Sequence, residues 1–329
     1  MGLKIIEEGL QTSIQDLGRH GFQSAGFTVT GAMDRWAMQL ANIVVNNQPE
    51  EAVLEMCYVG PSITFEQEMV IALTGADMSA KINGKQIELG KPIFVTAGET
   101  LQMRTAKRGL YCYLAVKGGF DIPELLGSKS ACIKDSLDDP YRGRLQVGDR
   151  IPVHQSAKSA PVNWRLSSSL FDYLETKTIE LHYLEGRQYN WFTKEAIHTF
   201  TSQPYKPTPQ SNRMGYRFTG PALEIHQQQD LITEATQFGT IQVPPDGQPI
   251  VLMAESQPTG GYPKIGQVIQ ADLPQLSQLR PGQPAIFKKV DLEFSYQRLM
   301  ERRRELFAIQ GSVRLKWKNH ETIHAQSQV

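Results

Sequence analysis

Most of the chain consists of short apolar or alternating runs that are separated by turn residues. Runs of this kind cover residues 68–77, 81–89, 91–103, 110–120, 177–186, 239–256 and 282–292. The turn residues include Asn83-Gly84, Gly118-Gly119, Asp246-Gly247 and Pro281-Gly282, and Asn-Gly is a strong signal for a two-residue hairpin. Many short strands between turns are typical of barrels and sandwiches, so the pattern predicts a mainly β fold.

Two segments show helical spacing instead. Residues 33–45 place apolar side chains on one helical face, with Asp34 in the first turn, where a carboxylate complements the helix dipole. Residues 291–309 start at the capping residue Asp291 and combine spaced leucines with a charged opposite face. We expect a helix from each segment and a frayed tail after Lys316.

The length of 329 residues favours two domains, because single hydrophobic cores stop growing near about 250–300 residues. Residues 155–176 are rich in Ser, Ala and Pro and poor in strand formers, which is typical of a connection between domains. We expect an N-terminal domain over residues 1–160, a C-terminal domain over residues 161–315, and a tail over residues 316–329.

Composition excludes several classes of partner. Lys+Arg number 34 and Asp+Glu also number 34, so no net charge attracts nucleic acid or an anionic membrane. The three cysteines form no CxxC pair and the seven histidines lack ligand spacing, so neither a disulfide framework nor a metal site is expected. The N-terminus lacks a signal-peptide pattern and no apolar run approaches about 18 residues. A cytoplasmic location is therefore predicted.

Common catalytic and nucleotide-binding motifs are missing from the sequence. It contains no GxxxxGK[ST] loop, no GxGxxG stretch after a strand, no HExxH and no GxSxG. Four polar, glycine-bearing segments remain as candidates for function.

The first candidate segment, residues 12–21 (TSIQDLGRHG), carries Asp16 and Arg19 around Gly18. It is either part of an active site or a polar turn with an exposed ion pair that contributes less than about 1 kcal/mol. The spacing alone favours the turn.

The second candidate segment, residues 28–42, has Gly31 before the expected helix, whose free N–H groups are able to hold an anion. The alternative is a helix N-terminus that is satisfied by Thr30 or Asp34. The residue pattern does not separate the two.

The third candidate segment, residues 211–221 (SNRMGYRFTGP), contains Asn212 and brackets Gly215 with Arg213 and Arg217. A guanidinium grips a carboxylate through two parallel hydrogen bonds, and both arginines would share a face if both lay in one strand. A solvated basic strand edge is the alternative.

The fourth candidate segment, residues 254–268, follows a strongly apolar strand and is the most informative. Adjacent glycines let backbone amides approach a ligand closely, and binding residues concentrate in loops on rigid scaffolds. A functional loop is favoured over a plain hairpin because of its dense polar side chains, which with the glycines are Glu255, Gln257, Thr259, Gly260, Gly261, Tyr262 and Lys264.

These segments, taken in order, resemble the allophanate hydrolase subunit 2 family, also called the biotin-dependent carboxyltransferase-like family. The resemblance runs from about residue 3 to residue 290 and includes TSIQDLGRHG, GAMDRWAMQLAN, LTGAD, YLAVKGGFDIPELLGSKS, SNRMGYRFTGP and GTIQVPPDGQPIVLMAESQPTGGYPKIGQV. It implies two cyclophilin-like β-barrel domains with a few short helices.

The resemblance also implies a function: one component of an ATP-dependent 5-oxoprolinase that opens 5-oxoproline to L-glutamate. The partners it implies are a KipI-like subunit together with a lactam-utilisation subunit, and ATP is the implied co-substrate of the complex. Two alternatives stay open, namely a KipA-type regulator that binds a KipI-like kinase inhibitor, and a carboxyltransferase that acts on a urea-like substrate with biotin.

Roles for the candidate residues follow from the chemistry of a small acid with a lactam ring. Such a site needs a cation for the carboxylate, donors for the developing oxyanion, and an acid or base near the ring nitrogen. Asp16, Asp34 and Glu255 are the candidate catalytic groups. The candidate binding residues are Arg19, Asn212, Arg213, Arg217, Gln257, Thr259, Gly260, Gly261, Tyr262 and Lys264.

Overall fold

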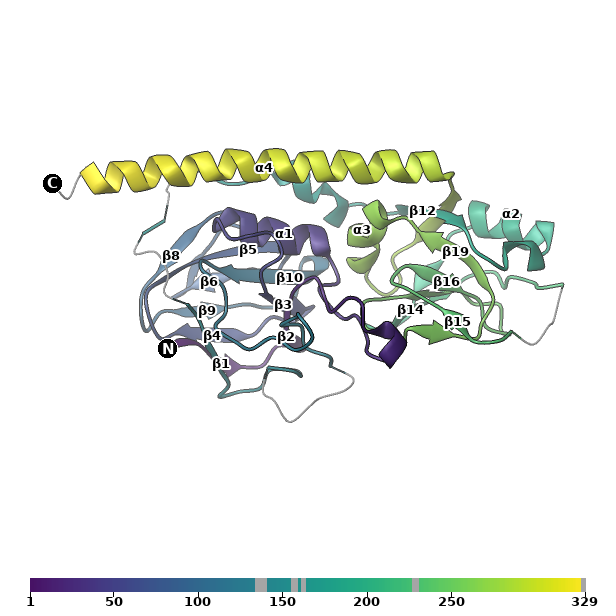
Figure 1. Cartoon of the computed structure of the whole chain (residues 1–329), viewed down its shortest axis with the longest axis horizontal. Coiled ribbons are helices and arrows are strands. Elements are labelled where there is room, and N and C mark those ends of the chain that lie inside the picture. Colours follow the sequence, from purple (N-terminus) through teal and green to yellow (C-terminus); the bar gives the residue numbers. More distant parts are fainter. Residues whose placement is uncertain (134–140, 155–158, 161–163, 227–230, 327–329) are drawn as a thin grey trace. The chain divides into compact units, whose positions relative to one another are not determined.

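The computed structural model describes residues 1–133, 141–154, 159–160, 164–226 and 231–326. The chain divides into two compact units. Unit 1 comprises Met1–Gly18, Asp34–Leu174 and Arg303–Val329, and unit 2 comprises Arg19–Met33 and Glu175–Arg302. Short strands dominate both units, as Figure 1 shows, so the mainly β prediction is confirmed.

Unit 1 contains two sheets whose strands come from the first half of the chain. One sheet has the order β11-β1-β4-β9-β6-β7 and the other the order β2-β3-β10-β5-β8. A continuous apolar cluster that includes Leu3, Ile14, Leu54, Ile71 and Leu114 draws residues from both sheets. The strands are β1 (Gly2–Glu7), β2 (Gln11–Gln15), β3 (Val53–Cys57), β4 (Ser62–Phe65), β5 (Met69–Asp77), β6 (Lys81–Ile82), β7 (Lys85–Gln86), β8 (Ile93–Val95), β9 (Thr100–Gln102), β10 (Arg108–Val116) and β11 (Arg150–Pro152).

The hairpin expected at Asn83-Gly84 is confirmed. Lys81–Ile82 pairs antiparallel with Lys85–Gln86, and the two loop residues have φ angles of 48° and 80°. Positive φ at both positions is what a type I′ turn requires, and Asn and Gly tolerate it best.

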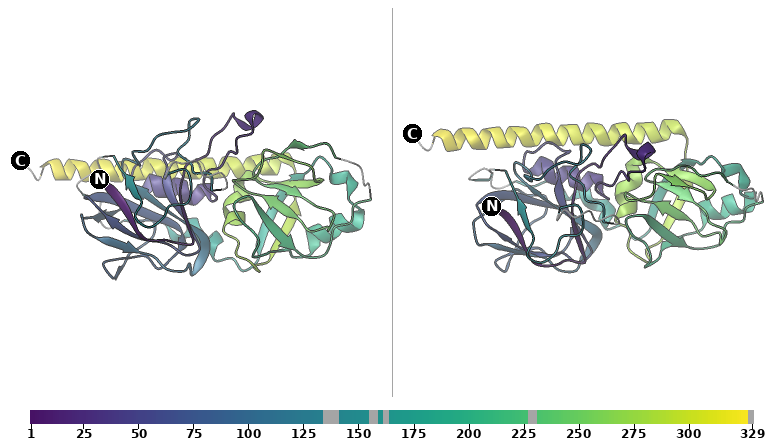
Figure 2. Two further views of the ribbon diagram at one scale, coloured as in Figure 1. Left: turned by 90° about the horizontal axis from the view of Figure 1, so that it is seen from below. Right: turned by 60° about the horizontal axis from the view of Figure 1, so that its bottom comes forward.

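The first expected helix is α1, Arg35–Val44, which packs on β5 and β10 of unit 1 (Figures 1 and 2). Asp34 is its N-cap, because its Oδ1 accepts from the Ala37 N–H at 2.9 Å. The Thr74 hydroxyl of β5 donates to the Ala37 carbonyl at 2.6 Å. The cap and this contact fix where α1 begins and how it lies on the sheet.

Unit 2 is built on a seven-stranded sheet in the order β13-β14-β17-β16-β19-β12-β20, beside a two-stranded ribbon of β15 and β18. Aromatic rings fill its core, and α2 (Lys194–Ser202) packs on β20 (Figure 2). The strands are β12 (Ile179–Glu185), β13 (Lys206–Pro207), β14 (Gly215–Thr219), β15 (Glu234–Ala235), β16 (Thr240–Gln242), β17 (Ile250–Leu252), β18 (Thr259–Gly260), β19 (Lys264–Val268) and β20 (Ala285–Lys289); a short helix, α3, spans Leu273–Ser277.

The last helix is longer than the sequence suggested. α4 spans Leu292–Gln326, so the expectation of short helices and of fraying after Lys316 is wrong for this segment. Within unit 1, Val313 and Trp317 are 3% and 1% exposed, and the Trp317 indole donates to the Val44 carbonyl at 3.0 Å. These two side chains, four residues apart, give the polar end of the helix an apolar anchor that a pattern of leucines alone does not reveal.

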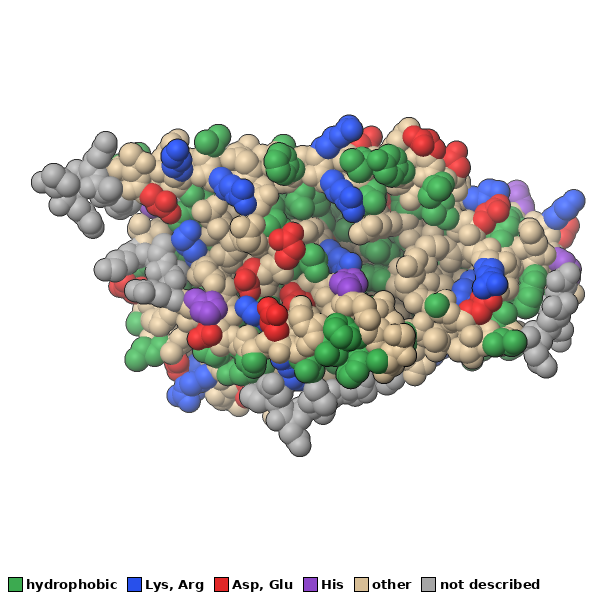
Figure 3. All heavy atoms as spheres, in the orientation of Figure 1, with side chains coloured by type: hydrophobic (Ala, Val, Ile, Leu, Met, Phe, Trp, Pro, Cys, Tyr) green, Lys and Arg blue, Asp and Glu red, His purple; other side chains and the backbone are tan. Residues whose placement is uncertain are grey.

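The surface of the described residues carries both signs of charge. On the face that Figure 3 shows, basic and acidic side chains are interspersed, in keeping with the balanced composition of the chain. Among the described residues, no helix is both long and apolar enough to cross a membrane.

Candidate functional site

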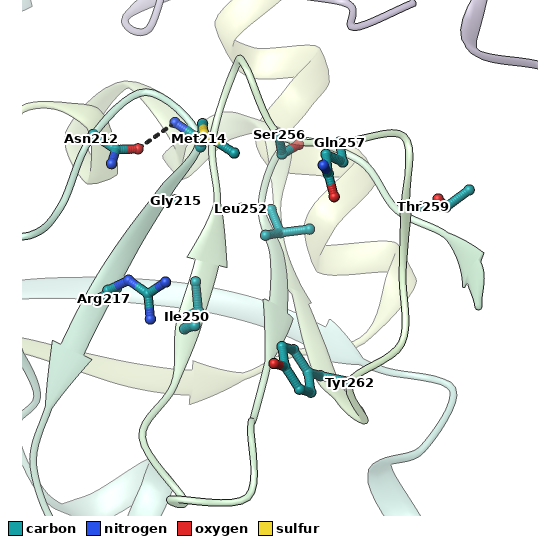
Figure 4. Close-up of a pocket in the computed structure, with 10 residues that line it drawn as sticks. All are labelled: Asn212, Met214, Gly215, Arg217, Ile250, Leu252, Ser256, Gln257, Thr259 and Tyr262. Carbon is teal, nitrogen blue, oxygen red and sulfur yellow. Dashed lines mark hydrogen bonds between the residues drawn. The ribbon is translucent and has the colours of Figure 1, made fainter. Parts of the chain in front are cut away.

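A pocket of about 240 Å³ opens on unit 2, beside the loop that the sequence singled out. Figure 4 shows its residues, which come from β14 and the turn before it, from β17, and from the segment after β17, which includes β18. They are Asn212, Met214, Gly215, Arg217, Ile250, Leu252, Ser256, Gln257, Thr259 and Tyr262. Five of them, Asn212, Arg217, Gln257, Thr259 and Tyr262, were expected from the sequence.

Strand alternation explains why these side chains reach the pocket. Tyr216 and Val251 are 1% and 0% exposed and form part of the core. Their neighbours Arg217 and Ile250 pair across β14 and β17, and they point to the opposite face because successive side chains in a strand alternate. Arg217 is exposed there, with its guanidinium beside Ile250 in Figure 4.

The same face continues across two more strands. Ile250 lies opposite Gln242 of β16, and Gln242 lies opposite Lys264 of β19. Paired residues of adjacent antiparallel strands project from the same face, so Arg217, Ile250, Gln242 and Lys264 form one row, which we call the pocket row. Gln242 and Lys264 are only 5% and 7% exposed.

The β15–β18 ribbon contacts the inner end of the pocket row. The Lys264 ammonium donates to Glu234 Oε2 of β15 at 3.0 Å, and the Gln188 amide donates to the same oxygen at 3.1 Å. Hydrogen bonds from Gln188 and then from Lys264 lower the pKa of Glu234. Gly260 of β18 lies so close to Gln242 that a Cβ at residue 260 would be 2.3 Å from Gln242 Nε2.

The two arginines of the third segment have different positions, contrary to the shared face that one strand would have given them. Arg213 precedes β14 and is 3% exposed. Its Nε donates to Glu255 Oε1 at 2.8 Å and its Nη2 donates to the Gly31 carbonyl at 2.7 Å. The buried pair of Arg213 and Glu255 therefore ties the loops of unit 2 together, and Arg217 is the arginine that lines the pocket.

Arg19, also in unit 2, is 5% exposed, and its Nη1 donates to the Thr30 hydroxyl at 3.0 Å. The Arg19 N–H also donates to the Val29 carbonyl at 2.8 Å. These bonds close the segment Arg19–Met33 on itself.

Asp16 and Asp34, the other two acidic candidates, belong to unit 1 and hold its local structure. Asp16 accepts from the hydroxyls of Ser128 and Ser130 and from the Lys129 N–H at 2.5–2.7 Å. Besides capping α1, Asp34 accepts from the Tyr173 hydroxyl at 2.6 Å.

Sequence reasoning missed the apolar walls Ile250 and Leu252 and the inner residues Gln188, Glu234 and Gln242. The walls lie in a strand that was expected to be core, and only pairing with β14 shows which of its side chains face outward. Long-range strand pairing places Glu234 and Gln242, and Gln188 joins them through its hydrogen bonds to Glu234 and to the Lys264 N–H. Among the described residues, no cluster of three or more His, Cys, Asp or Glu side chains is placed to hold a metal ion.

The chain matches a model of the carboxyltransferase domain, subdomains A and B, over residues 25–289. The chain belongs to this carboxyltransferase family. The resemblance drawn from the ordered sequence segments is thereby confirmed. The match includes the whole pocket row and ends before α4.

The similar proteins include two kinds of enzyme. The chain is 35% identical to the 5-oxoprolinase C subunit of Escherichia coli and 34% identical to that of Haemophilus influenzae, in each case over 88% of this chain and 92% of the relative. The crystal structure of K. lactis urea amidolyase superposes with a TM-score of 0.87 at 28% identity and covers 94% of this chain. This chain spans 20% of that enzyme's length.

The superposition with a solved carboxyltransferase-family structure covers nearly the whole chain, so the predicted fold class is confirmed. Within that fold, the pocket contains a cation, several neutral polar groups and two aliphatic walls. Such a site suits a small molecule that has one acidic group and an apolar ring or chain.

Proposed function

We propose that this chain is the C subunit of an ATP-dependent 5-oxoprolinase, which opens 5-oxoproline to L-glutamate. The observation that carries the proposal is the identity of 35% to a protein of that name, which matches over 92% of its length. Under the proposal, the partners are a KipI-like subunit together with a lactam-utilisation subunit, ATP is the co-substrate of the complex, and the complex is cytoplasmic.

The pocket supports this function through the chemistry of its walls. Arg217 supplies a guanidinium for the carboxylate of 5-oxoproline, since Arg pairs with carboxylates through two hydrogen bonds. Ile250 and Leu252 offer apolar surface to the ring, and Gln257 and Thr259 add polar contacts. Arg213 does not serve this role, because Glu255 neutralises it inside unit 2.

Among the described residues, those that line the pocket include no carboxylate and no histidine. Glu255, the nearest candidate acid in the sequence, is 3% exposed and paired with Arg213. A lactam-opening reaction needs a proton donor or acceptor near the ring nitrogen. We therefore assign substrate binding to this pocket and expect the partner proteins to complete the catalytic groups.

Reconstitution tests the proposal. The chain is mixed with its two partner proteins, and glutamate release from 5-oxoproline is measured with and without ATP. We expect release only with all three proteins and ATP. A complex that assembles but releases no glutamate contradicts the proposed enzymatic function and supports the KipA-type regulatory role.

Replacing Arg217 tests the assigned binding group. We expect Arg217→Gln to raise the KM for 5-oxoproline about 10- to 100-fold, because a charged hydrogen-bonded contact is lost. The matched control is Arg150→Gln, an arginine of unit 1 whose side chain is 64% exposed, and it should leave KM unchanged. An unchanged KM in Arg217→Gln would show that Arg217 does not bind the substrate.

Carboxyl transfer from biotin to a urea-like acceptor is a second candidate, favoured by the TM-score of 0.87 to K. lactis urea amidolyase. It predicts that a biotinylated carrier co-purifies with the chain. A streptavidin blot of the purified material detects such a carrier. If no carrier is found and the complex acts on 5-oxoproline, the result supports lactam opening over carboxyl transfer.

A further inference from the structure

The carboxamide nitrogen of Gln242 stands out in the pocket row because it is buried and has no hydrogen-bond partner among the described residues. Gln242 is 5% exposed, and its Nε2 has no hydrogen-bond partner within the part of the chain that the structure describes. More than about 90% of buried polar groups in proteins have a partner. A buried donor without a partner indicates that a group other than the described residues completes the site.

Two other glutamines of the same region have hydrogen bonds at both ends of the carboxamide. Gln267 of β19 accepts from the Thr240 hydroxyl at 2.8 Å and donates to the Phe238 carbonyl at 2.8 Å. Gln188 donates to Glu234 and accepts from the Lys264 N–H at 3.1 Å. These side chains hold structure together, whereas the carboxamide nitrogen of Gln242 holds nothing.

Gln242 is the cross-strand neighbour of a residue that lines the pocket. Gln242 lies directly opposite Ile250, which lines the pocket, and such paired residues have Cβ atoms about 4.5–5.5 Å apart. The terminal torsion of a glutamine is broad, so the carboxamide nitrogen is free to rotate toward a ligand over Ile250 without breaking a hydrogen bond of its own. Gly260 approaches Nε2 so closely that a Cβ at residue 260 would lie 2.3 Å from it, so this position of the carboxamide requires glycine there.

We propose that Gln242 is a second ligand-binding residue, whose Nε2 donates to a carbonyl oxygen of a small carboxylic acid held by Arg217. The inference rests on the proposed function, which supplies the lactam carbonyl. Arg217 and Gln242 flank Ile250 on neighbouring strands, so their backbones are about 9–10 Å apart. Ile250 lies between them on the same face of the sheet, so a small ring bound over Ile250 would lie between the two donors.

The lactam carbonyl is also the oxygen that gains negative charge when the ring opens. A donor at that oxygen stabilises the charge as it develops. Gln242 thus acts on the carbonyl end of the ligand and Arg217 on the carboxylate end, and the two contributions are separable with ligands that lack one end.

The test measures binding of three ligands to the full chain by calorimetry: 5-oxoproline, cyclopentanecarboxylate, which lacks the lactam, and 2-pyrrolidinone, which lacks the carboxylate. Gln242→Met keeps the length of the side chain and removes the donor. We expect it to weaken 5-oxoproline and 2-pyrrolidinone about 3- to 10-fold and to leave cyclopentanecarboxylate unchanged. Arg217→Gln should weaken the two acids and spare 2-pyrrolidinone.

Retained binding of cyclopentanecarboxylate shows that Gln242→Met has a folded pocket. The matched control is Gln275→Leu, a glutamine of α3 whose amide donates to the Glu180 carbonyl, and it should change no affinity. Equal loss for all three ligands, or no loss for 5-oxoproline, overturns the inference.

The outcomes also separate this inference from the proposed function. If the complex releases glutamate and Gln242→Met leaves its KM unchanged, the inference fails and the function stands. If the complex releases no glutamate but Gln242→Met still weakens 5-oxoproline and 2-pyrrolidinone without weakening cyclopentanecarboxylate, the proposed function fails and the binding role of Gln242 stands. If the wild-type chain and complex bind none of the three ligands, both fail.

Discussion

At the scale of single residues, Arg213 and Glu255 form a buried ion pair that stabilises unit 2 only while both partners are present. Removal of one partner leaves an unpaired buried charge, which costs about 3–5 kcal/mol. We expect Arg213→Met and Glu255→Gln each to lower the free energy of unfolding by about this amount in urea denaturation. The double variant should lose less than the sum, because no lone charge remains.

The two single variants and the double variant form a double-mutant cycle. Its matched control is the pair of Lys289 and Glu185, whose side chains are 49% and 52% exposed. Neutralising either of them should change the free energy of unfolding by less than about 1 kcal/mol. Strictly additive losses in the buried pair would show that its two members stabilise unit 2 independently.

At the scale of elements, the end of α4 depends on Trp317 for its attachment to unit 1. The indole is 1% exposed, donates to the Val44 carbonyl, and has the Lys117 ammonium 3.9 Å from its ring centroid. We expect Trp317→Ala to cost about 3–5 kcal/mol, measured by urea denaturation. Leu315→Ala, on the same helix but 63% exposed, should cost less than about 0.5 kcal/mol.

Hydrogen exchange of α4 gives a second measurement. In Trp317→Ala the amides around residue 317 should exchange faster, whereas those around residue 296 should not. Equal protection in the wild type and in Trp317→Ala would mean that the helix holds without its apolar anchor.

At the scale of the whole molecule, stability should depend on pH through His182. Its Nδ1 lies 2.8 Å from Asp272 Oδ2, and this hydrogen bond, together with the charges of Asp272 and Glu180, raises the pKa of His182 above 6.5. A raised pKa means that the folded state holds the proton more tightly than the unfolded state. The stabilisation is complete below pH 6.5 and is lost as the pH rises through the raised pKa.

Melting temperature as a function of pH tests this linkage. We expect the fall in stability above pH 6.5 to flatten in His182→Gln and to persist in His198→Gln, an exposed histidine of α2. The linkage is contradicted if His182→Gln keeps the slope of the wild type.

The strand pattern, the Asn83-Gly84 hairpin and the helix behind Asp34 could be predicted because each depends on neighbours within a few residues. Three of the pocket residues could also be found this way, since Gln257, Thr259 and Tyr262 lie in one glycine-rich loop. The end of α4 could not, because Trp317 anchors it to a carbonyl 273 residues away in the chain.

What the sequence by itself determined is the family, the mainly β fold and the segments that carry the site. The tertiary structure decided which side chains act together: it buried Arg213 against Glu255, turned Arg217 to the pocket, and aligned Gln242 with Ile250 and Lys264. The physical reason is strand register, because a shift of one residue moves every side chain to the other face. Register between strands far apart in the chain is set by long-range pairing, which no local pattern of residues contains.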